Sequence, residues 1–379
     1  ASRMMSYESS AASYELKKQA RCIVALEGDT DNNTFLLASL ALHGGNEVHV
    51  LEFNEDTNEV WCPLVYSHPH EVWACGSCPA AEHSELLLTT HSDGSQQRTT
   101  LWRMDGLADR ELAPELPQRG APQPRPMSEL CQLGSAAELG DCRAVLWNSV
   151  LPEQVASINR ASVTVWQLSH AAAASSAAEA GSASTPVEGA TYGCGRWDPH
   201  HAHALGLGCE RDLFTLDTRS MKAAVGVKGA HEGRVHGLDY NPNKPNTILS
   251  SGDDYYLRVW DLRKPSAPVM AQHAHAHWLT CATYNRFHDQ LLLSAGTDGS
   301  VKLWRAAAIS SSPPSLDHDD PEPPEADADG LVRAYLDHEQ SVFSAVWCAA
   351  DAWIFASVSL DGKAVISHVP PSEKYKILL

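Results

Sequence analysis

The sequence predicts an all-β fold, a single seven-bladed β-propeller with low-complexity loop insertions, because one strand pattern recurs along the chain. The clearest copy is the segment 229–263, where strand-like runs at 235–240, 247–251 and 257–261 are separated by turn-forming residues. A unit of this kind cannot bury its apolar faces alone, so several copies have to pack side by side. Repeats of about 40–45 residues with four strands each are typical of propeller blades.

The third strand of this copy ends in Trp260-Asp261, and the position of Trp260 is found again in six other runs. It is occupied there by Leu51, Trp102, Trp166, Leu216, Trp304 and Ser367. Positions 216, 260 and 304 are 44 residues apart, which is the length of an uninterrupted copy. Seven copies lie within the range of about 4 to 8 blades that close a propeller.

The blade boundaries follow from these positions. We expect blades at roughly 21–66, 67–134, 138–190, 191–229, 230–273, 274–337 and 338–379. The segment 13–20 is expected to close the ring by adding the outer strand to the last blade, since closure leaves only short, protected strand edges. The alternative is the C-terminal run 374–379, KYKILL, whose residues also alternate.

Three insertions interrupt the blades, and their composition predicts flexible segments. Residues 106–127 are rich in proline, residues 171–189 form an Ala/Ser tract, and residues 310–330 are acidic and rich in proline. Poly-alanine favours helix, but the serines, Gly181 and Pro186 argue for a loop in the second insertion. The acidic insertion could also dock on a basic partner.

The clearest copy resembles a WD40 repeat in its polar residues. In that family a His before the first strand, a Ser or Thr in the second, an Asp in the following turn and a Trp in the third form one hydrogen-bonded chain. The resemblance assigns these positions to His231, Ser250, Asp254 and Trp260. Each buried polar group would then have a partner, as an interior network requires. We expect a stabilising device and not an active site, because the set recurs in other blades.

Other blades carry the same set in whole or in part. The sixth blade has all four residues, and the seventh has a serine in place of the Trp. In the second blade His68 and Trp102 survive, with Asp93 only approximately placed. The first, third and fourth blades lack the full set. The residues concerned in the sixth and seventh blades are His275, Ser294, Asp298, Trp304, His338, Ser357 and Asp361.

Composition excludes several function classes. The formal net charge of −19 argues against a general affinity for nucleic acid or anionic lipid. No stretch approaches about 18 uninterrupted apolar residues, so we expect no transmembrane helix, and residues 1–18 do not resemble a signal peptide. Ten scattered cysteines suit free thiols in a reducing compartment, which predicts a cytoplasmic protein.

Metal and catalytic sites are not expected. Cys75-x-x-Cys78 lies near His68, His70 and His83, but residues three apart on a strand point to opposite faces, and no second cysteine pair follows at zinc-finger spacing. The histidine groups at 200–203 and 273–277 are also weak metal candidates. The sequence has no phosphate-binding loop or nucleophile elbow. We therefore predict a protein without cofactor, metal or enzymatic activity.

A more specific resemblance lies at the ends of the blades, where the sequence departs from general repeat positions. The chain resembles the family of EARP and GARP complex-interacting WD40-repeat proteins, closely from about residue 190 onwards. The segments that carry this resemblance are CGRWDPHH at 194–201, DTRSM at 217–221, YNPNK at 240–244, His277-Trp278 and the tail 374–379.

The resemblance implies a non-enzymatic adaptor. It would bind multisubunit vesicle-tethering complexes in endosomal recycling and endosome-to-Golgi transport. The implied partners are proteins, with no nucleic acid and no direct membrane insertion. The resemblance implies a monomeric propeller that works within a larger complex. It also implies a cytoplasmic protein that is recruited to endosome or trans-Golgi membranes.

Candidate partner-binding residues are Arg196, Trp197, His200, His201, Arg219 and Arg263. Asp217-x-Arg219 and Trp260-Asp261-x-Arg263 also match the short signature of cullin-RING ubiquitin ligase substrate receptors. The simpler interpretation is that each arginine pairs with a neighbouring blade. A third possibility is a stable scaffold subunit of a larger assembly, such as a ciliary or cytoskeletal complex.

Overall fold

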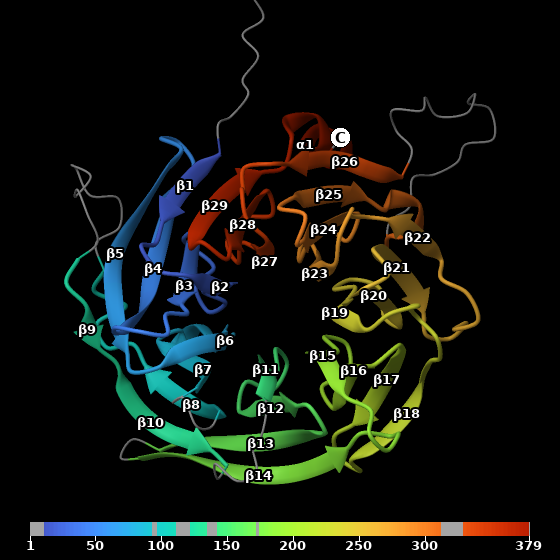
Figure 1. Ribbon diagram of the computed structural model, residues 1–379, viewed down its shortest axis with the longest axis horizontal. Coiled ribbons are helices and arrows are strands. Elements are labelled where there is room, and N and C mark those ends of the chain that lie inside the picture. The colour runs from blue at the N-terminus through green and yellow to red at the C-terminus, as the bar shows by residue number, and fades with distance from the viewer. Residues whose placement is uncertain are drawn as a thin grey trace, which may run out of the picture.

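The computed structural model describes residues 11–92, 97–110, 122–134, 142–171, 174–311 and 329–378. Seven antiparallel sheets are arranged around a central axis as the blades of a propeller (Figure 1). Each blade contains four antiparallel strands, and the short strand β9 (Arg125–Pro126) adds to the first blade in parallel with β5. The expected all-β, seven-bladed propeller is confirmed.

The seven inner strands surround the centre of the ring in Figure 1. They are β2 (Ala20–Ala25), β6 (Glu71–Ser77), β11 (Cys142–Trp147), β15 (Tyr192–Trp197), β19 (Val235–Tyr240), β23 (Leu279–Tyr284) and β27 (Val342–Trp347). The second strands are β3 (Thr34–Ser39), β7 (Leu86–Ser92), β12 (Gln154–Asn159), β16 (Ala204–Cys209), β20 (Thr247–Gly252), β24 (Leu291–Gly296) and β28 (Ile354–Ser359).

The third and outer strands complete the blades. The third strands are β4 (Asn46–Asn54), β8 (Gln97–Arg103), β13 (Ser162–Ala171), β17 (Asp212–Asp217), β21 (Tyr256–Asp261), β25 (Val301–Arg305) and β29 (Lys363–His368). The outer strands are β5 (Glu59–His68), β10 (Ser128–Leu133), β14 (Ala174–Ser184), β18 (Lys222–Val227), β22 (Met270–His273), β26 (Gly330–Tyr335) and β1 (Ala12–Glu15). Two short 3-10 turns, η1 (Ala81–His83) and η2 (Ala307–Ile309), lie in connections.

The position of Trp260 has the same register in every blade. Trp260 pairs with Ile248, the second residue of its second strand. The equivalent pairs are Leu51 with Phe35, Trp102 with Leu87, Trp166 with Val155, Leu216 with Leu205, Trp304 with Leu292, and Ser367 with Phe355. The seven sequence copies are therefore structurally equivalent even where Leu or Ser replaces Trp.

The core is divided among the blade interfaces. Seven apolar clusters are buried, and each joins two neighbouring blades. Second strands such as β20 and β24 are buried along their whole length, because neighbouring blades cover both faces of the sheet there. This burial explains their nearly continuous apolar sequence.

The inner strands share a feature that the sequence did not reveal. In each of them the pairing with the second strand shifts near the start of the inner strand, after its first residue or, in β6, after its second, which is the mark of a β-bulge. The bulged residues are Arg21, Trp73, Arg143, Gly193, His236, Thr280 and Phe343. All seven lie at the end of the propeller where the outer strand of one blade leads into the next blade.

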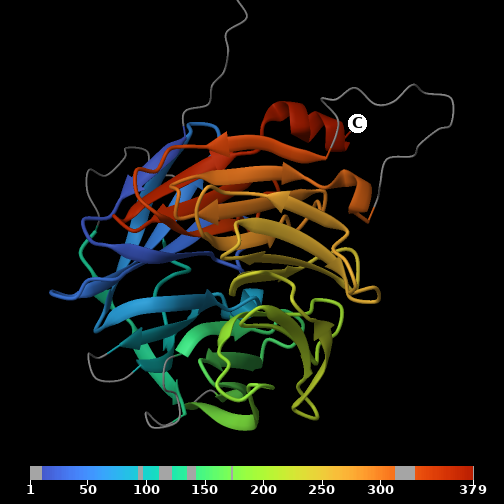
Figure 2. The same cartoon turned by 45° about the vertical axis from the view of Figure 1, so that its right-hand side comes forward.

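The ring is closed by β1. This strand pairs with β29 from Ala12 opposite Ile366 to Glu15 opposite Lys363, so the last blade takes its outer strand from the opposite end of the chain. The alternative strand at 374–379 is wrong, because the described residues there belong to the helix α1 (Pro371–Leu378) on the outer rim (Figures 1 and 2). Pro371 suits the first turn of a helix, and β1 already occupies the free edge of β29.

The expectation of a flexible loop at 171–189 is also wrong for its larger part. Residues Ala174–Ser184 form β14, which pairs with β13 over its length with one bulge near Trp166. Side chains along β14 alternate between the core and the solvent, which explains why this tract is a strand. Ala177 and Ala183 pack against apolar clusters, while Ala178 and Ser182 are exposed. A small-residue strand can therefore cover the long strand β13.

The other two insertions are described only at their ends. In the first, residues 106–110 form turns and β9 lies beside β5, while 111–121 fall outside the described residues. In the third, Asp329 accepts hydrogen bonds from the backbone of Ala307 and Ala308, while 312–328 fall outside the described residues. Among the described residues, no helix has both the length and the apolar character needed to span a membrane.

Candidate interaction surface

The fifth blade contains a continuous chain of hydrogen bonds. Asp254 lies 2.8 Å from Nδ1 of His231, Nε2 of His231 lies 2.8 Å from the Ser250 hydroxyl, and the indole N–H of Trp260 donates to that hydroxyl at 3.0 Å. Burial alone would raise the pKa of the Asp254 carboxyl, but hydrogen bonds from His231, the Glu232 backbone and Arg258 hold it well below its usual range. Burial lowers the pKa of His231.

The sixth blade repeats this arrangement. Nδ1 of His275 lies 3.0 Å from Asp298, and its Nε2 lies 2.8 Å from the Ser294 hydroxyl. The Trp304 indole donates to the same hydroxyl at 2.8 Å. In both cases the chain connects the segment before the inner strand with the second and third strands of the same blade, so its physical effect is to fix these parts to one another.

The seventh blade contains a variant of the network. Nε2 of His338 lies 2.8 Å from the Ser357 hydroxyl, but its Nδ1 faces Ser359 at 2.9 Å. Ser359 in turn donates to Asp361 at 2.5 Å. Asp361 therefore reaches the histidine through a second serine instead of directly. Ser367 is buried at the Trp position.

Two partial networks complete this set, and their hydroxyl residues, Thr89 and Ser157, were missed in the sequence. In the second blade the Thr89 hydroxyl lies 3.1 Å from Nε2 of His68 and accepts from the Trp102 indole at 2.8 Å. In the third blade Ser157 accepts from the Trp166 indole at 2.9 Å. The sequence did contain a signal for both. In each second strand, a hydroxyl residue comes two residues after the residue that pairs with the Trp. Asp93 lies outside the described residues.

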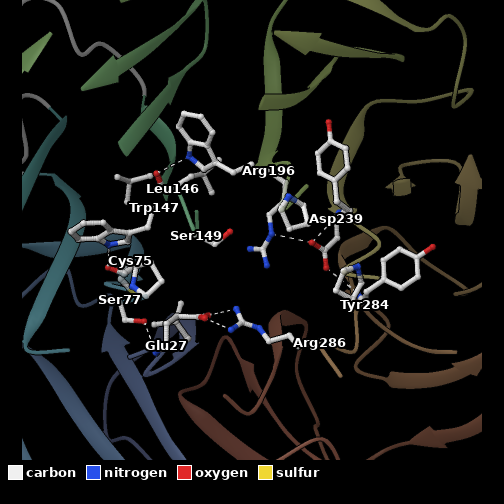
Figure 3. A pocket seen from close by; sticks show the side chains of 18 residues that line it. Glu27, Cys75, Ser77, Leu146, Trp147, Ser149, Arg196, Asp239, Tyr284 and Arg286 are labelled. Atoms are coloured by element: carbon white, nitrogen blue, oxygen red, sulfur yellow. Dashed lines mark hydrogen bonds and ion pairs between the residues drawn. The ribbon is translucent and has the colours of Figure 1, made fainter. Parts of the chain in front are cut away.

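A pocket of about 370 Å³ opens at the opposite end of the propeller, where the inner strands turn into the second strands. Two ion pairs face each other across it: Arg196 with Asp239 at 2.9 Å, and Arg286 with Glu27 at 2.5 Å (Figure 3). The Ser149 side chain also points into the pocket in Figure 3. Its charged groups are thus already neutralised within the protein.

The candidate residues on strand β15 and the turn after it have different environments. Arg196 and Trp197 both line the pocket, and Trp197 donates its indole N–H to the Leu146 carbonyl at 3.2 Å. Trp197 is only 3% exposed and packs between the third and fourth blades, so its main contacts are structural. His200 contacts the Asn241 carbonyl at 2.9 Å, and the exposed His201 pairs with Asp198 at 2.9 Å.

Arg219 and Arg263 lie in turns at the same end of the propeller. Arg219 donates to both oxygens of Asp217, and Arg263 does the same to Asp261. The expectation that these arginines pair with a neighbouring blade is wrong, because each forms a closed pair with the aspartate two residues before it. Both arginine side chains are more than 60% exposed, at 69% and 62%.

No group of three His, Cys, Asp or Glu side chains in the described part of the chain is arranged to hold a metal ion. The candidate Cys75 lies 2.8 Å, sulfur to sulfur, from Cys22 of the first blade, and all ten cysteines are free thiols. His275 belongs to the network of the sixth blade, and His277 contacts Thr297. These side chains therefore have structural contacts.

Comparison with known proteins gives a consistent result. A family model described as the EIPR1 beta-propeller matches residues 8–304. The protein called EARP and GARP complex-interacting protein 1 from Rattus norvegicus is 32% identical, over 97% of this chain and 98% of its own length. Its counterpart from Homo sapiens is 31% identical over the same shares. WD repeat-containing protein DWA2 from Arabidopsis thaliana is 30% identical over 96% of this chain and 97% of its own length.

Proposed function

Because the chain belongs to the EIPR1 beta-propeller family, we propose that it is a non-enzymatic adaptor that binds the vesicle-tethering complexes EARP and GARP. The observation that carries this proposal is the similarity to relatives named for those complexes, which extends over nearly the whole of both chains. Similarity of this extent makes it reasonable that the binding surface is shared as well as the fold.

The structure supports an interaction role in a second way. The polar clusters of the described residues are hydrogen-bonded networks within blades or closed ion pairs, and neither leaves a free nucleophile beside a general base. We propose that the protein works in endosomal recycling and endosome-to-Golgi transport, as a cytoplasmic protein recruited to membranes by the complexes it binds.

A pull-down tests the function. The tagged full chain is recovered from its native cells at moderate salt, and the bound proteins are identified by mass spectrometry. We expect the tethering-complex subunits, with an unrelated seven-bladed propeller carrying the same tag as the control. Recovery of a cullin adaptor, or of ciliary or cytoskeletal proteins, in place of those subunits would overturn the proposal.

The candidate residues at the pocket end allow the site of binding to be tested. We propose that Arg196, His200, His201, Arg219 and Arg263 contribute to contacts with the complex, since all five lie at one end of the propeller. A variant that combines Arg219→Ala with Arg263→Ala removes two exposed guanidiniums without touching a blade interface. Lower recovery of the complex with an unchanged Tm supports a contact at this end, and equal recovery excludes these two residues.

A further inference from the structure

Four of the seven bulged residues form a distinct group. Phe343, Arg21, Trp73 and Arg143 occupy the bulges of the seventh, first, second and third blades, which are neighbours around the ring. An aromatic residue and an arginine thus alternate over four consecutive inner strands. We call these four residues the collar.

Contacts between side chains join three of the four collar residues. The guanidinium carbon of Arg21 lies 4.7 Å from the centre of the Phe343 ring and 5.7 Å from that of Trp73. Distances below about 6 Å are those of cation–π contacts. The two rings belong to the blades on either side of Arg21, so they hold its guanidinium in a defined place.

The positive charge of the collar is not neutralised. Within the described part of the chain, neither Arg21 nor Arg143 has a carboxylate within ion-pair distance, and both side chains are exposed. Partial desolvation lowers the pKa of Arg21, and the nearby positive charge of Arg143 lowers that pKa further. Trp73 is 37% exposed beside them.

The contrast with the other end of the propeller is informative. There Arg196 and Arg286 each have a carboxylate partner, Asp239 and Glu27. His236, another bulged residue at the collar end, is paired with Asp253 at 2.6 Å. In a protein of net charge −19, two exposed arginines that lack such partners mark a place suited to anionic groups.

We propose that the collar binds an acidic, extended peptide segment of a protein partner. Carboxylate side chains of the segment would form charge-assisted pairs with Arg21 and Arg143, and its apolar residues would pack on Trp73 and Phe343. An anionic membrane is disfavoured, because a net charge of −19 repels a flat surface of the same sign. The inference deepens the proposed function, on which it rests, by naming one docking surface of the adaptor and the chemistry of the segment it takes.

Fluorescence anisotropy with the purified full chain tests the collar. The probe is a fluorescein-labelled ten-residue peptide of alternating Glu and Leu, and its counterpart with Gln in place of Glu is the control. We expect binding of the Glu peptide that weakens as salt increases, at least about tenfold weaker binding of the Gln peptide, and a similar loss in the variant R21Q/R143Q.

A matched variant shows whether the effect is local. K222Q/K264Q removes the same charge from two exposed lysines at the opposite end, and it should bind the Glu peptide as the wild type does. If R21Q/R143Q has a lower Tm, the single variant R143Q decides, since Arg143 is exposed and makes no contact with an aromatic ring. Equal affinity of R143Q and wild type for the Glu peptide would then overturn the proposal.

Two further outcomes would also overturn it. One is equal affinity for the Glu and Gln peptides. The other is binding to phosphatidylserine vesicles that needs Arg21 and Arg143 while the Glu peptide is not bound. Recovery of tethering-complex subunits by the wild type but not by R21Q/R143Q would connect the collar to the adaptor function. Because the peptide assay needs no tethering complex, its result is separate from failure of the proposed function.

Discussion

Buried histidines connect the stability of individual blades to pH. Burial is the main cause that lowers the pKa of His338 to about 4 and that of His68 to about 3. The unfolded chain keeps the ordinary value of 6.5, so below that pH it binds protons that the folded chain does not take up. These histidines contribute their full stability above pH 6.5, and the contribution is lost as the pH falls toward 4 for His338 and toward 3 for His68.

Urea unfolding at about pH 7.5 and about pH 5 measures this effect. We expect the free energy of unfolding to fall by about 2 kcal/mol for each of the two histidines over this interval. The variant His338→Gln no longer titrates at that position, so its stability should change less with pH than that of the wild type. Parallel pH profiles for the two proteins would contradict the assignment.

The Asp254 carboxylate is the second test at this scale. It contacts His231 and Arg258 and accepts a hydrogen bond from the Glu232 backbone at 3.0 Å. Asp254→Ala leaves these donors without that acceptor, which should lower the free energy of unfolding by about 3 kcal/mol. Asp31→Ala, at an exposed position, should change it by less than about 0.5 kcal/mol. Equal Tm values for the two variants would exclude a stabilising role of the network.

Sequence spacing located the residues of the two complete networks but not their exceptions. A fixed order of His, Ser, Asp and Trp can be read along one chain, because all four residues come from one short segment that leads through a single blade. The route through Ser359 in the seventh blade depends on side-chain direction, which the sequence does not contain. The ion pair between Arg196 and Asp239 could not be predicted either, because the two residues belong to different blades.

At the scale of elements, β14 shows where composition misled the prediction. Alanine favours helix and serine favours loops, yet the tract forms a strand because β13 offers it a partner along its whole length. The pairing of one strand with another outweighs weak local preferences. Alternation of small residues was present in the sequence, but it gives almost no hydrophobic contrast between the two faces.

Two neighbouring alanines of β14 test this strand. Ala177 packs against the cluster between the second and third blades, while Ala178 is exposed. Ala177→Asp should destabilise the protein by about 1–3 kcal/mol, because it places a charge against apolar side chains. Ala178→Asp should have almost no effect. Thermal unfolding measures both, and equally small shifts in Tm would indicate a loop.

The whole molecule depends on the closure of the ring by β1. Ala12 and Leu16 belong to the apolar cluster between the first and last blades, and Leu16 also donates its backbone N–H to the Gly362 carbonyl. Deletion of residues 1–16 should lower the free energy of unfolding by about 3 kcal/mol or more, since it removes buried apolar surface and the strand pairing together.

The deletion should also cause self-association. It exposes the edge of β29, and an exposed strand edge is a template for pairing with another chain. Light scattering after size-exclusion chromatography measures the association, and deletion of residues 1–10, which precede β1, is the control. A monomer of unchanged Tm after removal of residues 1–16 would show that β1 is dispensable.

The number and order of the blades could be predicted, because six of the seven blades take their four antiparallel strands from one contiguous segment with its own strand pattern. The inner-strand bulges could not be predicted, since a bulge is a property of the register between two strands. The collar was missed for the same reason. Arg21, Trp73 and Phe343 are far apart in the sequence, and only the ring brings them into contact.

Ring closure also sets an order of events during protein synthesis. Strand β1 precedes the other described strands along the chain, yet its partner β29 follows all of them. The first six blades can form their four antiparallel strands as their segments leave the ribosome, because each takes these four strands from one stretch of chain. Strand β1 must therefore wait for β29, so the propeller is completed only after β29 has been translated.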